Sequence, residues 1–292
     1  MRKPELIALL TLLAIPLHAA DVSDLSYDVI GDTVSITGCD TGASGTLIIP
    51  ETIEGKPVTS IGVDAFFECE FLTSITIPEG VTSIGDWAFD ECTRLNSITI
   101  GNGVTSIGDW AFYCCNDLNS ITIPDSVTSI GEKAFEFCIN LTSITIPEGV
   151  TSIKEKTFLD CWSLTNIIFL GNAPRLGFQA FHQVPANAKV YIYEGASGFG
   201  GKFGGFSVVV QKKPVPPKII SVVSSGDIIP MSSLTITFTS DIGSNYAIER
   251  SRDLVNWVTV VIIAGKETST KFTDNEPIND GEGVYYRIRE GQ

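Results

Sequence analysis

Histidine is almost absent from this chain. There are 2 histidines in 292 residues, and His18 lies within the first twenty, so a Ser-His-Asp or Cys-His catalytic unit further along could form only at His182. No cysteine and histidine share the spacing of a metal site. Adjacent carboxylates such as Asp90 and Glu91 occur without an evident apolar pocket that would raise a pKa. We therefore expect a protein that is not an enzyme, with no catalytic residue, no metal site and no cofactor.

Basic residues are also scarce. The chain has 19 Lys+Arg against 34 Asp+Glu, a formal net charge of −15 at pH 7. A surface of this sign repels the phosphates of nucleic acids and the headgroups of anionic lipids. We therefore expect no nucleic-acid partner, and the charge more simply keeps the protein soluble.

Long apolar runs are missing, apart from one near the start. The run Leu6–Leu17 follows two basic residues and precedes Ala19 and Ala20, which is the layout of a cleaved secretory signal. It is too short to span a bilayer as an anchor. The sequence predicts a signal peptide at residues 1–20, a secreted or cell-surface protein and no membrane insertion.

What the chain does contain is a 23-residue unit that recurs. Five copies open with Val-Thr-Ser-Ile and begin at Val58, Val81, Val104, Val127 and Val150. A fixed period of this length indicates a stack of identical supersecondary units, because one unit cannot bury its own apolar face. The sequence therefore predicts a solenoid, in which each unit forms one coil.

Each unit has two kinds of segment. Ile98 and Ile100 alternate with Ser97 and Thr99, a pattern that predicts a strand with the isoleucines inward and the hydroxyls outward. The Val-Thr-Ser-Ile stretch favours a second extended segment on another side of the coil. The segment around Ala88-Phe89 favours a single short helical turn. We expect parallel β rungs joined by such turns.

Five of the seven cysteines fall at one repeat position. They are Cys69, Cys92, Cys115, Cys138 and Cys161. Stacked equivalents lie about 4.8 Å apart with parallel side chains, whereas a disulfide requires Cβ atoms about 3.8 Å apart that point toward each other. We expect a column of buried free thiols. The other two, Cys39 and Cys114, could be free, paired or reactive.

The flanking segments divide the chain further. A β-hairpin before the repeats should cover the first coil, and a glycine-rich stretch should close the last one. A proline-rich segment then precedes about 75 residues of short β runs, which favour a small β-sandwich. The predicted parts are a signal peptide at 1–20, an N-terminal hairpin cap at 21–45, a solenoid with its C-terminal cap at 46–210, a linker at 211–217 and a β-sandwich at 218–292.

The repeat resembles a known family. The string L-x-x-I-x-I-P-x-x-V-x-x-I-x-x-x-A-F-x-x-C, from Leu72 to Cys92, resembles the BspA-like subclass of leucine-rich repeats, over Thr46 to about Tyr193. The resemblance implies a curved solenoid on an exported or surface-attached protein of a bacterium or protist, with adhesins among the members. The segment from Glu249 to Trp257 looks like part of a fibronectin-III-like module.

Two outward surfaces are candidates for binding. The strand face carries Ser74, Thr76, Ser97, Thr99, Ser120, Thr122, Ser143 and Thr145. Regular hydroxyls could engage a glycan or a protein backbone, although threonine is also a good strand residue in its own right. On the turn side, Trp87, Trp110 and Tyr113 predict a patch of rings, which either marks a contact surface or packs against neighbouring coils.

These features favour an adhesion-type interaction protein. We expect the repeat surface to bind an extracellular protein or glycan, while the C-terminal domain spaces or attaches it. The alternative is a structural, self-associating component of an extracellular matrix or cell envelope. A third interpretation is a targeting piece of a larger secreted hydrolase system.

Overall fold

The computed structural model describes residues 18–212, 219–225, 233–239, 245–251, 258–264, 269–274 and 285–291. Most of the predicted signal peptide and most of the predicted linker lie outside these residues. The chain forms two compact units, Met1–Gln211 and Lys212–Gln292. No helix among the described residues is long and apolar enough to cross a membrane.

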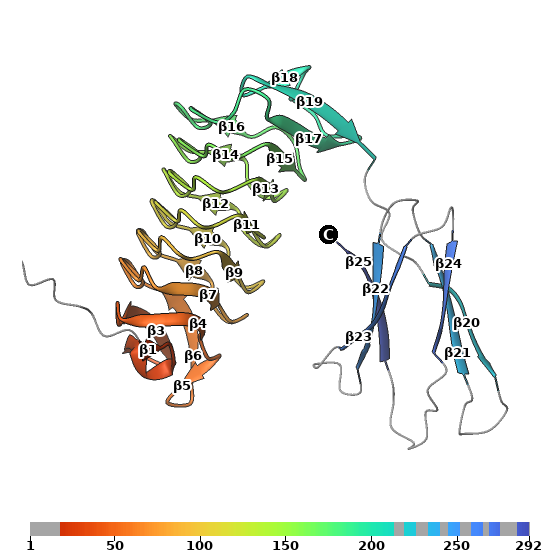
Figure 1. Ribbon diagram of the computed structural model, residues 1–292, viewed down its shortest axis with the longest axis horizontal. Coiled ribbons are helices and arrows are strands. Elements are labelled where there is room, and N and C mark those ends of the chain that lie inside the picture. The colour runs from red at the N-terminus through yellow and green to blue at the C-terminus, as the bar shows by residue number, and fades with distance from the viewer. Residues whose placement is uncertain are drawn as a thin grey trace, which may run out of the picture. The chain divides into compact units, whose positions relative to one another are not determined.

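The first unit is a solenoid with two columns of short parallel strands (Figure 1). The first column carries the strand face and consists of β4 (Ala43–Ile48), β7 (Leu72–Thr76), β9 (Ser97–Thr99), β11 (Ser120–Ile121), β13 (Ser143–Ile146), β15 (Asn166–Phe169), β17 (Lys189–Tyr193) and β19 (Phe206–Gln211). Short strands β1 (His18–Ala19) and β18 (Lys202–Phe203) pair with β4 and β19. Partners lie 23 residues apart in the repeats, as between Ser74 and Ser97, so the predicted register is confirmed.

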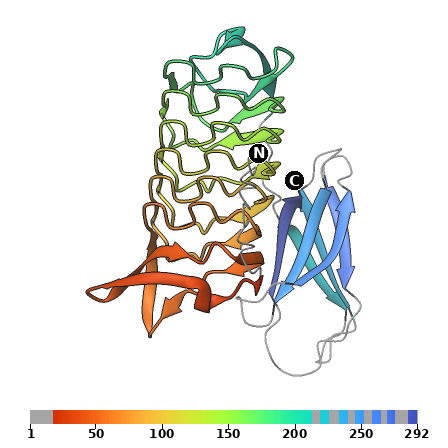
Figure 2. The same cartoon turned by 60° about the vertical axis from the view of Figure 1, so that its left-hand side comes forward.

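The second column is built from the Val-Thr-Ser-Ile segments. Its strands are β3 (Thr33–Cys39), β6 (Lys56–Ile61), β8 (Ser83–Ile84), β10 (Ser106–Ile107), β12 (Ser129–Ile130), β14 (Ser152–Ile153) and β16 (Arg175–Leu176). Strands β6, β8, β10, β12 and β14 are the predicted second extended segments of the five copies, and Figure 2 shows the coils stacked one above another.

The predicted helical turn around Ala88-Phe89 is wrong. Trp87 and Glu91 have left-handed φ values of 51° and 57°, which a right-handed helix does not contain. The amide of Phe89 donates to the carbonyl of Ala111 in the next coil at 2.8 Å, so it is not available for an α-helical bond. The segment is a run of tight turns whose amides alternate between local bonds and bonds to the next coil.

Stacked phenylalanines fill the interior of the solenoid. Phe89 and Phe112 are fully buried, and their ring centroids lie 5.1 Å apart at an interplanar angle of 4°. The same stack continues through Phe66, Phe89, Phe112, Phe135, Phe158 and Phe181. The ring spacing follows the strand spacing of about 4.8 Å, so each ring inside the stack has two neighbours and no coil is packed independently.

The five cysteines at the common repeat position are free and buried, as expected. Each thiol from the second coil onward donates to the phenylalanine carbonyl of the coil before it, for example Cys92 Sγ to Phe66 O at 3.1 Å. Burial raises the pKa of Cys115 and of Cys138, so these sulfurs stay protonated and unreactive. Cys39 and Cys114 are also free and partly exposed.

Both ends of the solenoid are covered. The predicted N-terminal hairpin is formed by β2 (Leu25–Ile30) and β3, which pair antiparallel after a 3-10 turn at Val22–Asp24, and β5 (Thr52–Ile53) pairs with β6. At the other end, Phe199 and Phe203 of the glycine-rich segment contact Phe169 at 5.3 and 5.5 Å. Glycine-rich backbone lets this segment fold back tightly over the last coil.

The first column has one irregular step. Strand β7 pairs with β9 and β11 pairs with β13, but β9 and β11 form no strand pair in the described structure. The turn after β9 is Gly101-Asn102-Gly103, where three of the other four copies have a proline. The Asn102 amide donates to Glu79 Oε2 at 2.6 Å. A Cβ at Gly103 would lie 2.1 Å from the Glu79 carbonyl oxygen, so glycine is required there. This turn is held against the preceding coil.

The described residues of the second unit form two three-stranded antiparallel sheets. One consists of β20 (Ile219–Ser225), β21 (Ser233–Thr239) and β24 (Ser269–Asp274), and the other of β23 (Val258–Ala264), β22 (Asn245–Ser251) and β25 (Tyr285–Gly291). Phe238 of the first sheet contacts Tyr246 of the second, with ring centroids 5.4 Å apart. Both rings are fully buried, so the two sheets share an apolar core.

Candidate interaction surfaces of the repeat

The eight hydroxyl residues of the strand face lie together on β7, β9, β11, β13 and the residues that follow these strands. Their side chains point outward and are exposed or half-buried, while the isoleucines between them are buried. Among the eight, only Ser120 makes a side-chain hydrogen bond within the described structure, to Asn119 Oδ1 at 3.1 Å. The other seven hydroxyls are therefore available to a partner.

The threonines of the second column behave differently. The hydroxyl of Thr82 donates to the Thr59 carbonyl at 3.1 Å, and that of Thr105 donates to the Thr82 carbonyl at 3.1 Å. Thr59 and Thr128 make longer contacts of the same kind, at 3.5 and 3.4 Å. These hydroxyls link successive coils, as does that of Thr142 just before β13, which donates to the Asn119 carbonyl at 3.1 Å. The threonines among the eight strand-face residues make no such bond in the described structure.

The predicted aromatic patch is present in part. Trp87 and Trp110 stack with ring centroids 5.0 Å apart and an interplanar angle of 12°. Trp87 remains 36% exposed, whereas Trp110 is half-buried. The Tyr113 ring contacts the Phe137 ring edge-on, with centroids 5.6 Å apart, and does not stack on the two tryptophans. Burial raises the pKa of Tyr113 to about 12, so its hydroxyl stays protonated.

Asp90 corrects one expectation from the sequence. The residue is 8% exposed, and its Oδ1 has no hydrogen-bond partner among the described residues. Burial raises the pKa of Asp90 to about 6, with a smaller contribution from the negative charge of Glu91. A carboxyl buried on the turn side was unexpected, because the sequence does not show how deeply the side chain at this repeat position lies in each coil.

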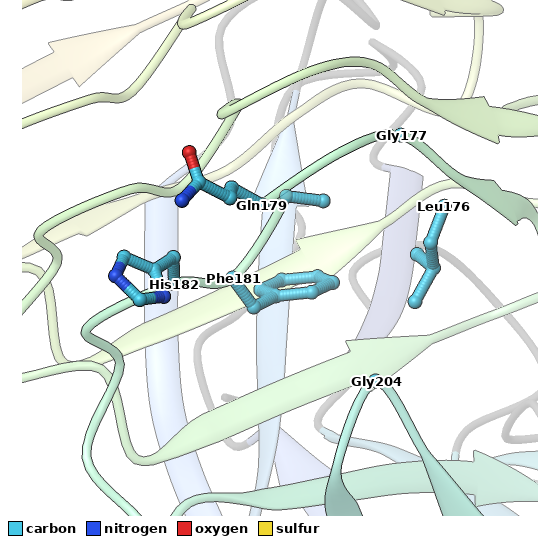
Figure 3. Close-up of a pocket in the computed structure, with 7 residues that line it drawn as sticks. Leu176, Gly177, Gln179, Phe181, His182 and Gly204 are labelled. Carbon is cyan, nitrogen blue, oxygen red and sulfur yellow. The ribbon is translucent and has the colours of Figure 1, made fainter.

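His182, the histidine considered for catalysis, lies at a shallow pocket at the C-terminal end of the repeats (Figure 3). The pocket has a volume of about 310 Å³. Its lining residues are Leu176, Gly177, Gln179, Ala180, Phe181, His182 and Gly204. This lining offers an imidazole and an amide, but no serine, cysteine or carboxylate that could form a catalytic unit with the histidine.

One group of possible metal ligands was not evident from spacing in the sequence. His18, Asp24 and Asp40 bring their ligand atoms within 4.8 Å of one another, and His18 Nε2 lies 2.5 Å from Asp24 Oδ1. Only the pairing of β1 with β4 brings His18 to the other two. His18 and Asp24 form an imidazole-carboxylate hydrogen bond at the N-terminal end of the solenoid.

Comparison with known proteins agrees with this geometry. Residues 59–187 match the family described as "BspA type Leucine rich repeat region", in six copies. Comparison with curated proteins finds none that matches. The T. pallidum leucine-rich repeat protein TpLRR is similar in structure, with a TM-score of 0.52 and 26% identity over 57% of this chain and 91% of that one.

A leucine-rich cell-surface protein from Faecalibacterium prausnitzii is also similar, with a TM-score of 0.52 and 29% identity. The match covers 72% of this chain and 59% of that one, so the chain spans less than two thirds of the relative's length. The sequence match over residues 59–187 and the structural similarity thus agree on a parallel β solenoid of the leucine-rich-repeat type.

Proposed function

We propose that the repeat region is a non-enzymatic interaction module of a secreted or cell-surface protein, and that its strand face binds an extracellular protein or glycan. The observation that carries the proposal is the hydrogen-bonding state of the strand face. Seven of its eight hydroxyls have no partner in the described structure, and they repeat at the spacing of the strands. Such groups can bond to the hydroxyls of a sugar or to a peptide backbone without losing an internal bond.

The charge distribution supports the same surface. The chain is strongly acidic, with 34 Asp+Glu against 19 Lys+Arg, yet the outward positions of β7, β9, β11 and β13 carry only serine and threonine. A neutral polar surface can approach a glycan or another protein at little desolvation cost compared with a carboxylate. One structural relative, from F. prausnitzii, is described as a cell-surface protein, which is consistent with an exported role.

The C-terminal unit has a separate role in this proposal. The described strands of its two small sheets share an apolar core of their own. We infer that it is a fibronectin-III-like sandwich that spaces the repeat region or attaches it.

The experiment is a binding screen followed by a matched pair of variants. The chain that begins after residue 20 is applied to an array of glycans and extracellular-matrix proteins, and saturable ligands are then titrated. Removal of four strand-face hydroxyls by Ser97→Ala, Thr99→Val, Ser120→Ala and Thr122→Val should weaken binding at least about tenfold, since each lost hydrogen bond is worth about 0.5–1.5 kcal/mol. Unchanged affinity in a folded variant would refute the strand face as the binding surface. Concentration-dependent self-association without any ligand would instead favour a structural component.

A further inference from the structure

One outward position on the turn side has the same backbone geometry in six coils. The residues at this position are Asp64, Trp87, Trp110, Lys133, Lys156 and Gln179. All six have left-handed φ values, between 51° and 56°. In the first five, the amide donates to a carbonyl of the next coil, as Trp87 does to Asp109 at 2.9 Å. Their side chains therefore leave the solenoid at equivalent points and lie one above another.

Within this column, Trp110 is enclosed between two neighbours. One face of its indole stacks on Trp87 at 5.0 Å. On the side of the next coil, the Lys133 ammonium lies 4.6 Å from the ring centroid, within the range of a cation–π contact. The chain thus shows how a cation one coil away occupies an indole face at this position.

Trp87 has no such cation on its outer face. The two indoles stack along the solenoid axis at a spacing close to one coil, so the face of Trp87 that does not meet Trp110 looks toward the preceding coil. The residue at that point is Asp64, whose short side chain is exposed and cannot cover an indole. No cation of the described chain contacts this face, and Trp87 keeps 36% of its surface exposed.

The coils that flank this free face are acidic in sequence. Between residues 57 and 132 the sequence has eleven carboxylates and one basic residue, Arg94, which lies over the Phe71 ring at 5.2 Å. Glu68 and Glu91 extend outward on the same turns as Asp64 and Trp87, at positions that also have left-handed φ. The field at the free indole face therefore attracts positive charge.

We propose that Trp87 and Asp64 form a binding site for an arginine side chain presented by a partner protein. A guanidinium is planar, so it stacks on the indole face while its N–H groups donate to the Asp64 carboxylate, which a compact ammonium does less well. The contact copies the one between Lys133 and Trp110, with the cation supplied from outside. The site lies on the turn side of the coils and does not depend on the strand-face proposal.

The first test uses a blocked pentapeptide, acetyl-Gly-Gly-Arg-Gly-Gly-amide, and the same peptide with neutral citrulline. Both are titrated into the chain that begins after residue 20, and the indole N–H resonances of its tryptophans are followed. The arginine peptide should shift the Trp87 resonance with millimolar affinity that falls as salt rises, and the citrulline peptide should not. Equal shifts with both peptides would overturn the proposal.

Variants locate the site. Trp87→Ala should abolish the difference between the two peptides, and Asp64→Asn should weaken arginine binding about 3- to 10-fold. Trp162→Ala is the control, because that indole is 56% exposed at a different repeat position and its N–H already donates to the neighbouring Asp160 carboxylate at 3.0 Å. Its loss should leave the response of the Trp87 resonance unchanged. Binding that survives Trp87→Ala would contradict the proposal. The strand-face variant should bind the arginine peptide normally, so the two proposals can fail separately.

A gain-of-function variant tests the mechanism. Lys133→Asp removes the internal cation from Trp110 and recreates on its outer face the arrangement that Trp87 has with Asp64. Aspartate tolerates the left-handed backbone of this position, where Lys133 has φ 56°. The arginine peptide should then shift the Trp110 resonance as well. If the Trp110 indole resonance does not shift in the folded variant, an uncovered indole face beside a carboxylate is not sufficient to bind the guanidinium, and the proposed mechanism is wrong.

Discussion

The inner and outer sides of the same strands both carry repeated residues, but the repetition has a different cause on each side. On the inner side, Ile98 and Ile121 are at most 6% exposed and pack into the shared core. On the outer side, Thr99 and Thr122 are exposed, and their hydroxyls make no internal hydrogen bond in the described structure. Repetition inside reflects packing, because every residue must fit two neighbouring coils. Repetition outside has no such cause, which makes the outer side the candidate for binding.

The two threonine columns sharpen this contrast. Thr105 donates to a carbonyl of the preceding coil, whereas Thr99, in the strand column, does not. The sequence alone cannot distinguish them, since both are exposed threonines with a 23-residue period. The hydrogen-bond partner separates a structural threonine from an available one.

The largest effect should come from the inner side. Phe112→Ala removes a ring that stacks between Phe89 and Phe135 at 5.1 and 5.3 Å. We expect a loss of about 3–5 kcal/mol in the free energy of unfolding of the repeat region, measured by urea denaturation followed by circular dichroism. Hydrogen exchange should also accelerate in both adjacent coils. Faster hydrogen exchange confined to the mutated coil would contradict a core that is shared between coils.

An intermediate, pH-dependent effect is expected at Asp90, which lies on the boundary between inside and outside. Its pKa of about 6 in the folded protein exceeds the ordinary value of about 3.9, so the folded state binds the proton more tightly. Wild-type stability should therefore rise as the pH falls from about 6 to 4, and the ionised group is destabilising above pH 6.

Asp90→Asn should accordingly stabilise the repeat region by about 1–3 kcal/mol at pH 7, and the difference from wild type should shrink toward pH 4. Thermal or urea unfolding of both proteins across this range checks it. Glu91→Gln is a control beside it, because that carboxylate is more accessible and its neutralisation should have the smaller effect. A stability difference between Asp90→Asn and wild type that does not vary with pH would exclude the buried carboxylate as its cause.

The smallest effects should separate the two threonine columns. Thr105→Val removes the hydroxyl donor, but the Thr82 carbonyl still accepts the Thr105 amide at 2.8 Å, so the cost should be only about 0.5–1 kcal/mol. Thr99→Val removes a hydroxyl without an internal partner and should change stability by less than about 0.5 kcal/mol. If Thr105→Val and Thr99→Val lower the free energy of unfolding equally in the same assay, the strand-face hydroxyls also have structural partners.

Much of the repeat architecture followed from the period and the alternation of side chains. The inward isoleucines, the buried cysteines and the N-terminal hairpin all depend on burial and turn chemistry that are local to the sequence. The conformation of the turn around Ala88-Phe89 did not follow from the sequence pattern, because hydrogen bonds to the next coil determine its left-handed residues. Propensity within one unit does not contain that information.

The candidate surfaces were predictable only as residue positions. The sequence placed Trp87 and Trp110 in one outward column, but not the Lys133 ammonium over the second ring. It also did not reveal the buried Asp90 or the missing pairing between β9 and β11, since each depends on side-chain depth or on the fit of one turn to the preceding coil. These features arise between coils, where small differences among copies decide contacts.

The most direct test compares the two outer columns in one binding experiment. An array ligand of the wild-type protein is titrated into the Thr99→Val/Thr122→Val variant and into the matched Thr82→Val/Thr105→Val variant, both verified as folded. The strand-face variant should bind several-fold more weakly while the matched variant retains wild-type affinity. Equal affinity in all three proteins, or a loss only in the matched variant, would contradict the strand face as the binding surface.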